Sequence, residues 1–245
     1  MDDSSYGEVA EQRGSPSEAP SPPWRAIEAL FVGLTGFGLG VVLSIIVVLA
    51  TPDRGLRLVF SLLVGSLSLS AATIAWVAFL HQGAFAALGL RTRRPVGDVA
   101  IGIVVGVLSY PLIVLVLGAL LYTLLSLLAG GPVTPPRQEL LPRRPDELEV
   151  AIGAVSAILV APVAEELFFR GFLFGALRRR FGVGIAAVAS AVPFALVHLY
   201  LLLMPLLFAF GIVLAYIYER RGSLFASMAA HAAFNVVGFL VYLLL

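Results

Sequence analysis

Two adjacent carboxylates and an arginine lie inside an otherwise apolar stretch of this sequence. Glu165, Glu166 and Arg170 fall within six residues, in the string Ala-Pro-Val-Ala-Glu-Glu-Leu-Phe-Phe-Arg-Gly that ends at Gly171. A charged side chain near the centre of a bilayer costs about 2.5–3.5 kcal/mol on insertion scales. Three such groups together indicate that they face one another or a wet cavity, where they can do chemistry.

The spacing of these three residues predicts two different roles. On a helix, Glu166 and Arg170 are four residues apart and share a face, so they are expected to neutralise each other. Glu165 points about 100° away from Glu166 around the same helix. It therefore stays unpaired by the arginine and is available for chemistry.

Two later segments add imidazoles and a carboxamide, in Phe194-Ala-Leu-Val-His198 and in His231-Ala-Ala-Phe-Asn235. Glu165 and His198 lie about sixteen residues on either side of a predicted turn near residues 180–183, so an antiparallel helix pair places them at one depth. By the same rise, Asn235 lies closer to that level than His231 does. A single membrane histidine is as often a packing residue, and Phe194 is read as packing near the site. The combination with the only asparagine favours a functional site.

These side chains are sufficient parts for hydrolysing an amide. A buried carboxylate beside a histidine can take a proton from water and deliver the nucleophile. Histidine and asparagine donors can then stabilise the oxyanion, by about 2.7–4 kcal/mol for one such donor in a protease. The chain has no cysteine, which excludes thiol chemistry. An alternative is zinc held by Glu165, His198 and His231 with an open fourth position, although the sequence lacks a His-Glu-x-x-His motif.

Composition places the chain among polytopic membrane proteins. Hydrophobic residues make up 60% and charged residues 13%, and the mean hydropathy is +0.99. No basic and aromatic surface points to nucleic acid, so the expected surroundings are the lipid bilayer. Spans need about 20 apolar residues, and seven are predicted, with an eighth possible if the third is broken: Ala29–Ala50, Leu58–Leu80, Val99–Leu128, Val150–Leu173, Val183–Leu203, Leu206–Tyr218 and Leu224–Leu244.

The predicted organisation is one all-α transmembrane bundle behind a polar tail. Residues 1–23 are rich in Ser, Pro and Glu and are expected to be disordered, whereas residues 24–245 form a single domain with the site helices in 148–245. The arginines predict the orientation in the membrane. In the seven-span arrangement, ten of them lie on the same side of the membrane as the N-terminus and five lie on the opposite side. We expect a cytoplasmic N-terminus and a location in a bacterial plasma membrane.

The ordered motifs Glu-Glu-x-x-x-Arg, Phe-x-x-x-His and His-x-x-x-Asn resemble those of one family of intramembrane endopeptidases. This is the CAAX protease and bacteriocin-processing family (CPBP, or Abi), whose members include type II CAAX prenyl endopeptidases. The strings Glu-Glu-Leu-Phe-Phe-Arg-Gly and Tyr-Glu-Arg-Arg-Gly-Ser-Leu are similar too, and the resemblance extends over residues 151–240.

The resemblance implies a role for each residue of the site. Glu165 is the implied base that activates water, with His198 assisting, and His231 and Asn235 are the implied oxyanion donors. Glu166 and Arg170 support the site. It also implies a metal-free glutamate mechanism without a cofactor and a peptide or protein substrate in the membrane, but it selects no cleavage sequence, prenyl requirement or oligomeric state.

Two further classes of function fit parts of the pattern. A proton-coupled transporter would use Glu165, Glu166 and His198 as a relay, but the inverted repeats typical of such proteins are not visible in the sequence. A non-catalytic membrane scaffold would use the same fold to hold a partner. Loss of proteolysis in Glu165→Ala with unchanged membrane insertion distinguishes an endopeptidase from both.

Overall fold

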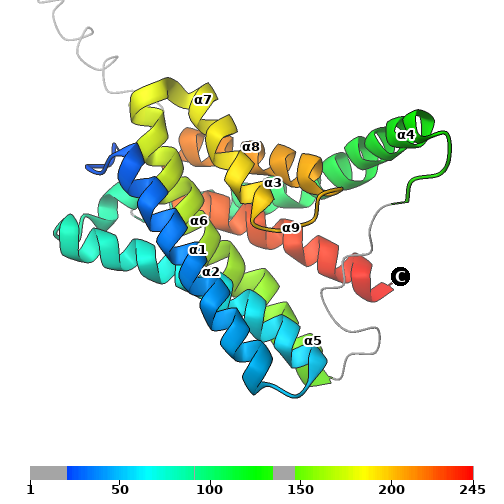
Figure 1. Ribbon diagram of the computed structural model, residues 1–245. Coiled ribbons are helices and arrows are strands. Elements are labelled where there is room, and N and C mark those ends of the chain that lie inside the picture. The colour runs from blue at the N-terminus through cyan, green and yellow to red at the C-terminus, as the bar shows by residue number, and fades with distance from the viewer. Residues whose placement is uncertain (1–20, 91, 135–146, 245) are drawn as a thin grey trace, which may run out of the picture.

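The computed structural model describes residues 21–90, 92–134 and 147–244, and every regular element in these ranges is helical, which confirms the all-α prediction. Residues 1–20 of the predicted tail and the predicted loop arginines 137, 143 and 144 lie outside the described residues. In chain order (Figure 1), the elements are α1 (Ala26–Ala50), α2 (Arg54–Leu80), η1 (Phe85–Leu88), α3 (Pro95–Tyr110), η2 (Pro111–Leu117), α4 (Gly118–Ala129), α5 (Glu147–Val155), η3 (Ser156–Val160), α6 (Ala161–Glu166), η4 (Leu167–Phe174), α7 (Gly175–Leu196), α8 (Met204–Arg221) and α9 (Leu224–Leu244).

Five described segments are long and apolar enough to cross a membrane: Ala26–Ala50, Gly55–Leu80, Pro95–Ala129, Glu147–Leu196 and Leu224–Leu244. Many of their apolar side chains are exposed, such as Leu49 at 82% and Phe79 at 86%. Outward-facing apolar surface on this scale suits lipid and not water. The chain is therefore an integral membrane protein, whereas the count of seven crossings stays a prediction.

The 50-residue segment Glu147–Leu196 contains a reversal of chain direction. Gly182 has φ 79° and ψ 170°, a backbone region that is essentially restricted to glycine. Figure 1 shows the chain rising through α5 and α6 and turning back within α7. The turn predicted near residues 180–183 is confirmed.

Helix α7 ends earlier than the sequence pattern predicted. The expected helix Val183–Leu203 stops at Leu196, and Leu199 adopts a positive φ of 57°. His198 therefore lies in the turn after the helix, where its ring Nδ1 lies 2.8 Å from the Phe194 carbonyl oxygen. This contact satisfies one of the carbonyls that a helix end leaves without an N–H donor. Apolar composition hid this ending, because the turn 199–203 is as hydrophobic as a span.

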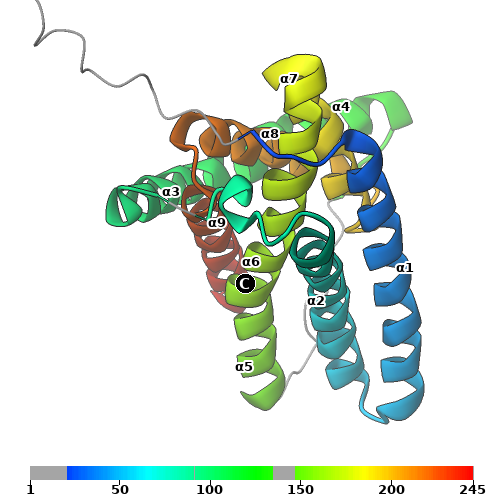
Figure 2. The same cartoon turned by 90° about the vertical axis from the view of Figure 1, so that its left-hand side faces the viewer.

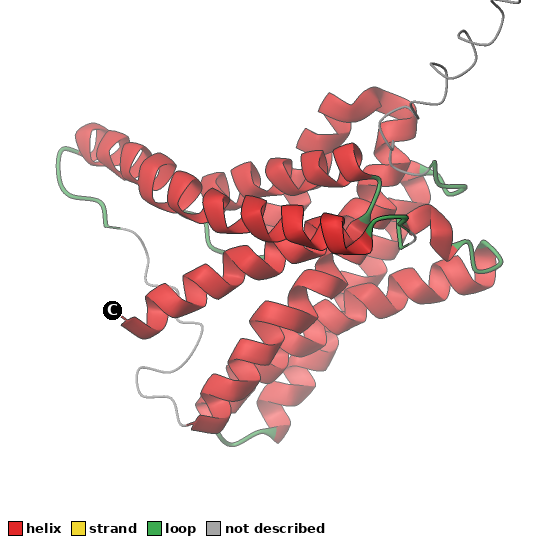
Figure 3. Ribbon diagram, turned by 180° about the vertical axis from the view of Figure 1, so that it is seen from behind, coloured by secondary structure: helices red, strands yellow, loops and turns green. Residues whose placement is uncertain are grey.

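The helices fall into two groups that cross each other. Figure 2 shows α1, α2 and the α5–α6 segment side by side and nearly parallel, with α3 and α8 running across them. Seen from behind in Figure 3, α9 lies between these groups. Residues on α6, α7 and α9 thereby reach one central layer.

Helices α3 and α9 pack with their backbones in close contact. A Cβ atom added at Gly102 or Gly106 would collide with the carbonyl oxygens of Ala226 and Ala230, respectively. Small residues allow this approach in membranes, where packing drives helix association. The position of α9 thus depends on two glycines of α3.

The segment before α1 is anchored to the helices that carry the charged motif. Trp24 is 1% exposed, stacks on Phe172 with ring centroids 4.7 Å apart, and donates its indole N–H to the Phe172 carbonyl at 2.9 Å. Arg179 donates to the carbonyl of Pro22 at 2.8 Å. Pro22 is buried, so the end of the predicted tail is a packed part of the fold.

Several chain turns meet at one end of the molecule. Arg178 of α7 pairs with Glu219 of α8 at 2.9 Å, and Arg221 donates from Nε to Asp98 of α3 at 2.8 Å. His81, at the end of α2, packs edge-on against Trp24. The segments predicted to share the arginine-rich side are therefore neighbours in space.

Candidate active site

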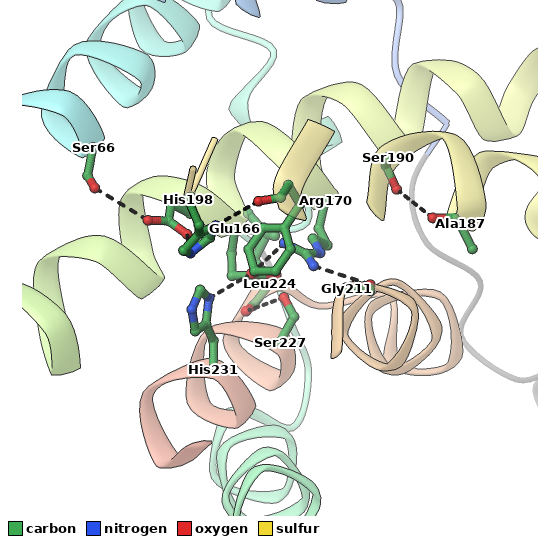
Figure 4. A network of polar contacts seen from close by, with 12 residues as sticks. Ser66, Glu166, Arg170, Ala187, Ser190, His198, Gly211, Leu224, Ser227 and His231 are labelled. Atoms are coloured by element: carbon green, nitrogen blue, oxygen red, sulfur yellow. Dashed lines mark hydrogen bonds and ion pairs between the residues drawn. The ribbon is translucent and has the colours of Figure 1, made fainter. Parts of the chain in front are cut away.

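Glu166, Arg170 and His231 form a buried polar cluster at the centre of the fold (Figure 4). Arg170 Nη1 donates to Glu166 Oε1 at 2.8 Å, and His231 Nδ1 lies 3.0 Å from the same oxygen. The exposed fractions are 0% for Glu166, 1% for Arg170 and 3% for His231. Arg170 also donates to the Gly211 carbonyl of α8 at 3.2 Å. The predicted Glu166–Arg170 pair is confirmed, and the carboxylate additionally binds a histidine of α9.

Glu165 lies on the same helix as Glu166, but its carboxylate faces a different set of groups. Its Oε2 lies 4.0 Å from His198 Nε2, and its Oε1 accepts a hydrogen bond from Ser66 Oγ of α2 at 3.4 Å. Oε2 is buried without a hydrogen-bond partner among the described residues. The structure thus brings Glu165 and His198 to one depth, and it leaves one carboxylate oxygen available.

The His198 ring is oriented by the end of α7. A carbonyl oxygen only accepts, so the 2.8 Å contact with Phe194 requires the proton on Nδ1. In the neutral ring, Nε2 then carries the lone pair, and this nitrogen faces Glu165. The 4.0 Å gap between Nε2 and Oε2 is too long for a direct hydrogen bond, and it suits one water molecule bonded to both.

Phe194 packs among the side chains of the candidate site, as its position in the sequence predicted. The Arg170 guanidinium carbon lies 4.3 Å from the centre of the Phe194 ring. The same ring meets His198 and His231 edge-on, with centroids 5.1 and 5.7 Å away. An aromatic face stabilises a cation in this position. Phe194 therefore contacts both histidines and the arginine, and fixes their spacing.

Asn235 makes its hydrogen bond outside this cluster. Its Nδ2 donates to the Ala157 carbonyl of η3 at 2.7 Å. His231 and Asn235 share one face of α9, as their spacing predicted, and both contact the continuous segment that carries the two glutamates. One of the two amide N–H groups of Asn235 is used in this way.

Ser66 is the site residue that sequence reasoning missed. It lies on α2 among other serines, and no motif distinguishes it. Ser68 and Ser70 on the same helix instead donate to backbone carbonyls one turn back, at 2.7 and 3.1 Å. Only the way α2 packs on α6 turns Ser66 towards Glu165, so the sequence carried no signal.

The described residues contain no group of three His, Asp or Glu side chains arranged to bind one metal ion. Glu165 and His198 face each other, but His231 is directed at Glu166. A catalytic zinc needs three protein ligands whose nitrogen or oxygen atoms lie about 2.0–2.2 Å from a common centre. The side-chain directions therefore do not fit the zinc alternative of Glu165, His198 and His231.

The fold and the site define a polytopic membrane protein with a buried centre of two carboxylates, two imidazoles and an arginine. Residues 147–237 match the family described as Type II CAAX prenyl endopeptidase Rce1-like. This part of the chain is therefore similar to the family that the sequence motifs resemble, and all seven candidate site residues named from the sequence fall within it.

Two bacterial proteins are similar to part of the chain. Over 86 residues the chain is 31% identical to the Bacillus subtilis (strain 168) protein titled "Putative membrane peptidase YdiL", covering 35% of each chain. Over 83 residues it is 31% identical to "UPF0177 protein YxdF" of Lactococcus lactis subsp. lactis (strain IL1403), covering 33% of this chain and 44% of that protein. The chain thus matches less than half the length of either relative. No solved structure gives a significant match.

Proposed function

We propose that the protein is an intramembrane endopeptidase that hydrolyses peptide bonds of membrane-associated peptides or proteins with a water activated by Glu165. One observation carries this proposal. Glu165 Oε2 is buried and has no hydrogen-bond partner among the described residues, and His198 Nε2 lies 4.0 Å from it with its lone pair towards it. The two groups can hold one water between them, and both can accept its proton. The family match over residues 147–237 supports the same class of reaction.

The proposed reaction begins with proton transfer from water to Glu165. The water oxygen bonds to the carbonyl carbon of the substrate and forms a tetrahedral intermediate, while His198 orients the attacking oxygen. When the carbon–nitrogen bond breaks, the proton held by Glu165 passes to the leaving amine. The carbon–oxygen bond formed replaces the carbon–nitrogen bond broken, and the proton taken from water ends on the amine, so no covalent enzyme intermediate is needed.

His231 and Asn235 are the proposed donors to the oxyanion. His231 Nδ1 is bonded to Glu166, and a protonated His231 would carry a second N–H, on Nε2, that can donate to the oxyanion. Arg170 fixes Glu166 from the other side. The second amide N–H of Asn235 supplies a further donor. A single donor of this type is worth about 2.7–4 kcal/mol in a well-studied protease.

A metal-free reaction is part of the proposal. Its support is the direction of His231, which binds Glu166 and does not converge with Glu165 and His198 on one point. The proposed cofactor requirement is therefore none.

The test is cleavage of a membrane-peptide library by detergent-purified protein, with and without a strong chelator. Glu165→Gln keeps the shape of the side chain but removes the base, so we expect the rate to fall by about 10²–10⁴. Glu219→Gln is the matched control, because its carboxylate pairs with Arg178 away from the site, and it should cleave like the wild type. Loss of cleavage with chelator, restored by zinc, would assign the chemistry to a metal. Equal cleavage by wild type and Glu165→Gln would refute the proposed base.

A further inference from the structure

A proline interrupts the backbone hydrogen bonds two residues beyond the π-helical segment η3. In this segment the N–H of Ala161 donates to the Ser156 carbonyl, five residues back. The next bond of the same series would run from residue 162 to the carbonyl of Ala157. Residue 162 is proline and has no N–H. The Ala157 carbonyl is therefore left without its donor from the helix.

Asn235 supplies the missing donor from another helix. Its Nδ2 lies 2.7 Å from the Ala157 oxygen, which is a short and well-formed hydrogen bond. Within the hydrocarbon region no water is at hand to bond a freed carbonyl, so a proline is tolerated where a neighbouring side chain does so. The single asparagine of the chain and the proline of α6 thus complement each other.

The hydrogen bond between Asn235 and Ala157 lies close in sequence to the two glutamates, so it bears on the orientation of their side chains. Glu165 and Glu166 lie three and four residues after Pro162 on α6, so the way the backbone closes around the proline sets the rotation of their side chains. Helix α9 holds the same segment a second time, through His231 and Glu166 at 3.0 Å. The two contacts together fix α9 against the helix that carries the proposed base.

We infer that Asn235 is a positioning residue that substitutes for the N–H absent at Pro162 and thereby orients Glu165. The catalytic part of this inference rests on the proposed function. If Asn235 acted only as a donor to the oxyanion, its effect would not depend on the residue at position 162. If it acts as a positioning residue, the effects of substitutions at positions 162 and 235 are coupled.

A double-mutant cycle measures this coupling. The four proteins are wild type, Asn235→Ala, Pro162→Ala and the double variant, and the measured quantities are kcat and KM for cleavage. Alanine at position 162 restores an N–H for the Ala157 carbonyl. We expect Asn235→Ala to lower kcat in both backgrounds without changing KM. The fold-decrease in kcat should be about ten times larger when Pro162 is present than when it is replaced in Pro162→Ala. Pro111→Ala, at the start of the π-helical segment η2 on a different helix, is the matched control. In that background the effect of Asn235→Ala on kcat should be as large as in the wild type.

The midpoint of thermal unfolding in detergent is the second readout, and it needs no proteolysis. Asn235→Ala should lower it by several degrees in the Pro162 background and by much less beside Pro162→Ala. Pro162→Val carries the same N–H in a side chain of similar volume, and replaces Pro162→Ala if that variant does not fold.

Equal effects of Asn235→Ala in both backgrounds, in kcat and in thermal midpoint, would overturn the inference. That result leaves the proposed function intact if cleavage still requires Glu165. Conversely, coupled thermal midpoints in a protein that cleaves nothing would support the Asn235–Pro162 relation and reject the proposed endopeptidase.

Discussion

At the scale of single residues, the site separates two neighbouring carboxylates by what each of them contacts. Glu166 is neutralised by Arg170 and bound to His231, and it is completely buried. Removing one partner of such a buried pair costs about 3–5 kcal/mol, because the other charge is left unpaired. Among the described residues, Glu165 has as partners a serine and an imidazole that lies 4.0 Å away. About 100° of helix rotation thus separates the paired carboxylate of Glu166 from that of Glu165, the proposed base.

Part of this arrangement could be predicted from the sequence, and part could not. The Glu166–Arg170 pair is local to one helix, and its spacing of four residues is enough to predict it. The depth of Glu165 and His198 followed from counting residues around one turn. The partners of Ser66, His231 and Asn235 depend on how helices tilt and rotate against one another, and the spacing along a single helix carries no record of that.

Ser66 allows a prediction at this scale. Removing its hydrogen bond in Ser66→Ala frees one oxygen of Glu165 to rotate, and we expect kcat to fall by roughly tenfold, equivalent to about 1.4 kcal/mol, with KM unchanged. Ser66→Thr keeps the hydroxyl and should restore most of the rate. Ser68→Ala is the control, because that hydroxyl bonds only to its own helix. A loss of equal size in Ser68→Ala would show that the effect comes from α2 and not from Glu165.

At the scale of helices, α9 is positioned by the smallest residues of α3. A Cβ at Gly106 would lie 2.9 Å from that of Ala233, and it would also collide with the Ala230 carbonyl. His231 is the next residue after Ala230, so any separation of the two helices moves the imidazole away from Glu166. The candidate site therefore depends on a helix that lies outside residues 147–237, the part of the chain that matches the family model.

Gly106→Ala tests this dependence. Overpacking of a close interface typically costs about 1–3 kcal/mol, so we expect a lower midpoint of thermal unfolding in detergent together with reduced cleavage. Gly38→Ala on α1 is the matched control, since nothing lies within 4 Å of a Cβ built there. Unchanged stability in Gly106→Ala would mean that α3 and α9 can separate without cost.

At the scale of the whole molecule, the contacts gather the arginine-rich turns at one end. The Arg178–Glu219 and Arg221–Asp98 pairs tie α7, α8 and α3 together, and Arg179 binds the segment before α1. An arginine-rich surface favours the cytoplasmic side of a membrane. We therefore expect this end of the fold to face the cytoplasm.

Because the chain has no cysteine, single cysteines can report this orientation directly. Ser21→Cys lies at the arginine-rich end, and Gly131→Cys follows α4 on the predicted outer side. A membrane-impermeant maleimide added to bacterial spheroplasts should label Gly131→Cys at once and Ser21→Cys only after permeabilisation. The reverse pattern would place the N-terminus outside.

The anchoring of Trp24 also gives the protein an optical reporter. The chain has two tryptophans, and both indoles are hydrogen-bonded near the start of α1: Trp24 to the Phe172 carbonyl and Trp76 to Glu28. Phe172 lies two residues beyond Arg170, in the helix that carries the site. Selectively excited tryptophan fluorescence therefore reports on one end of the molecule, and a shift in its emission on adding a peptide would record a change around these two indoles without any label.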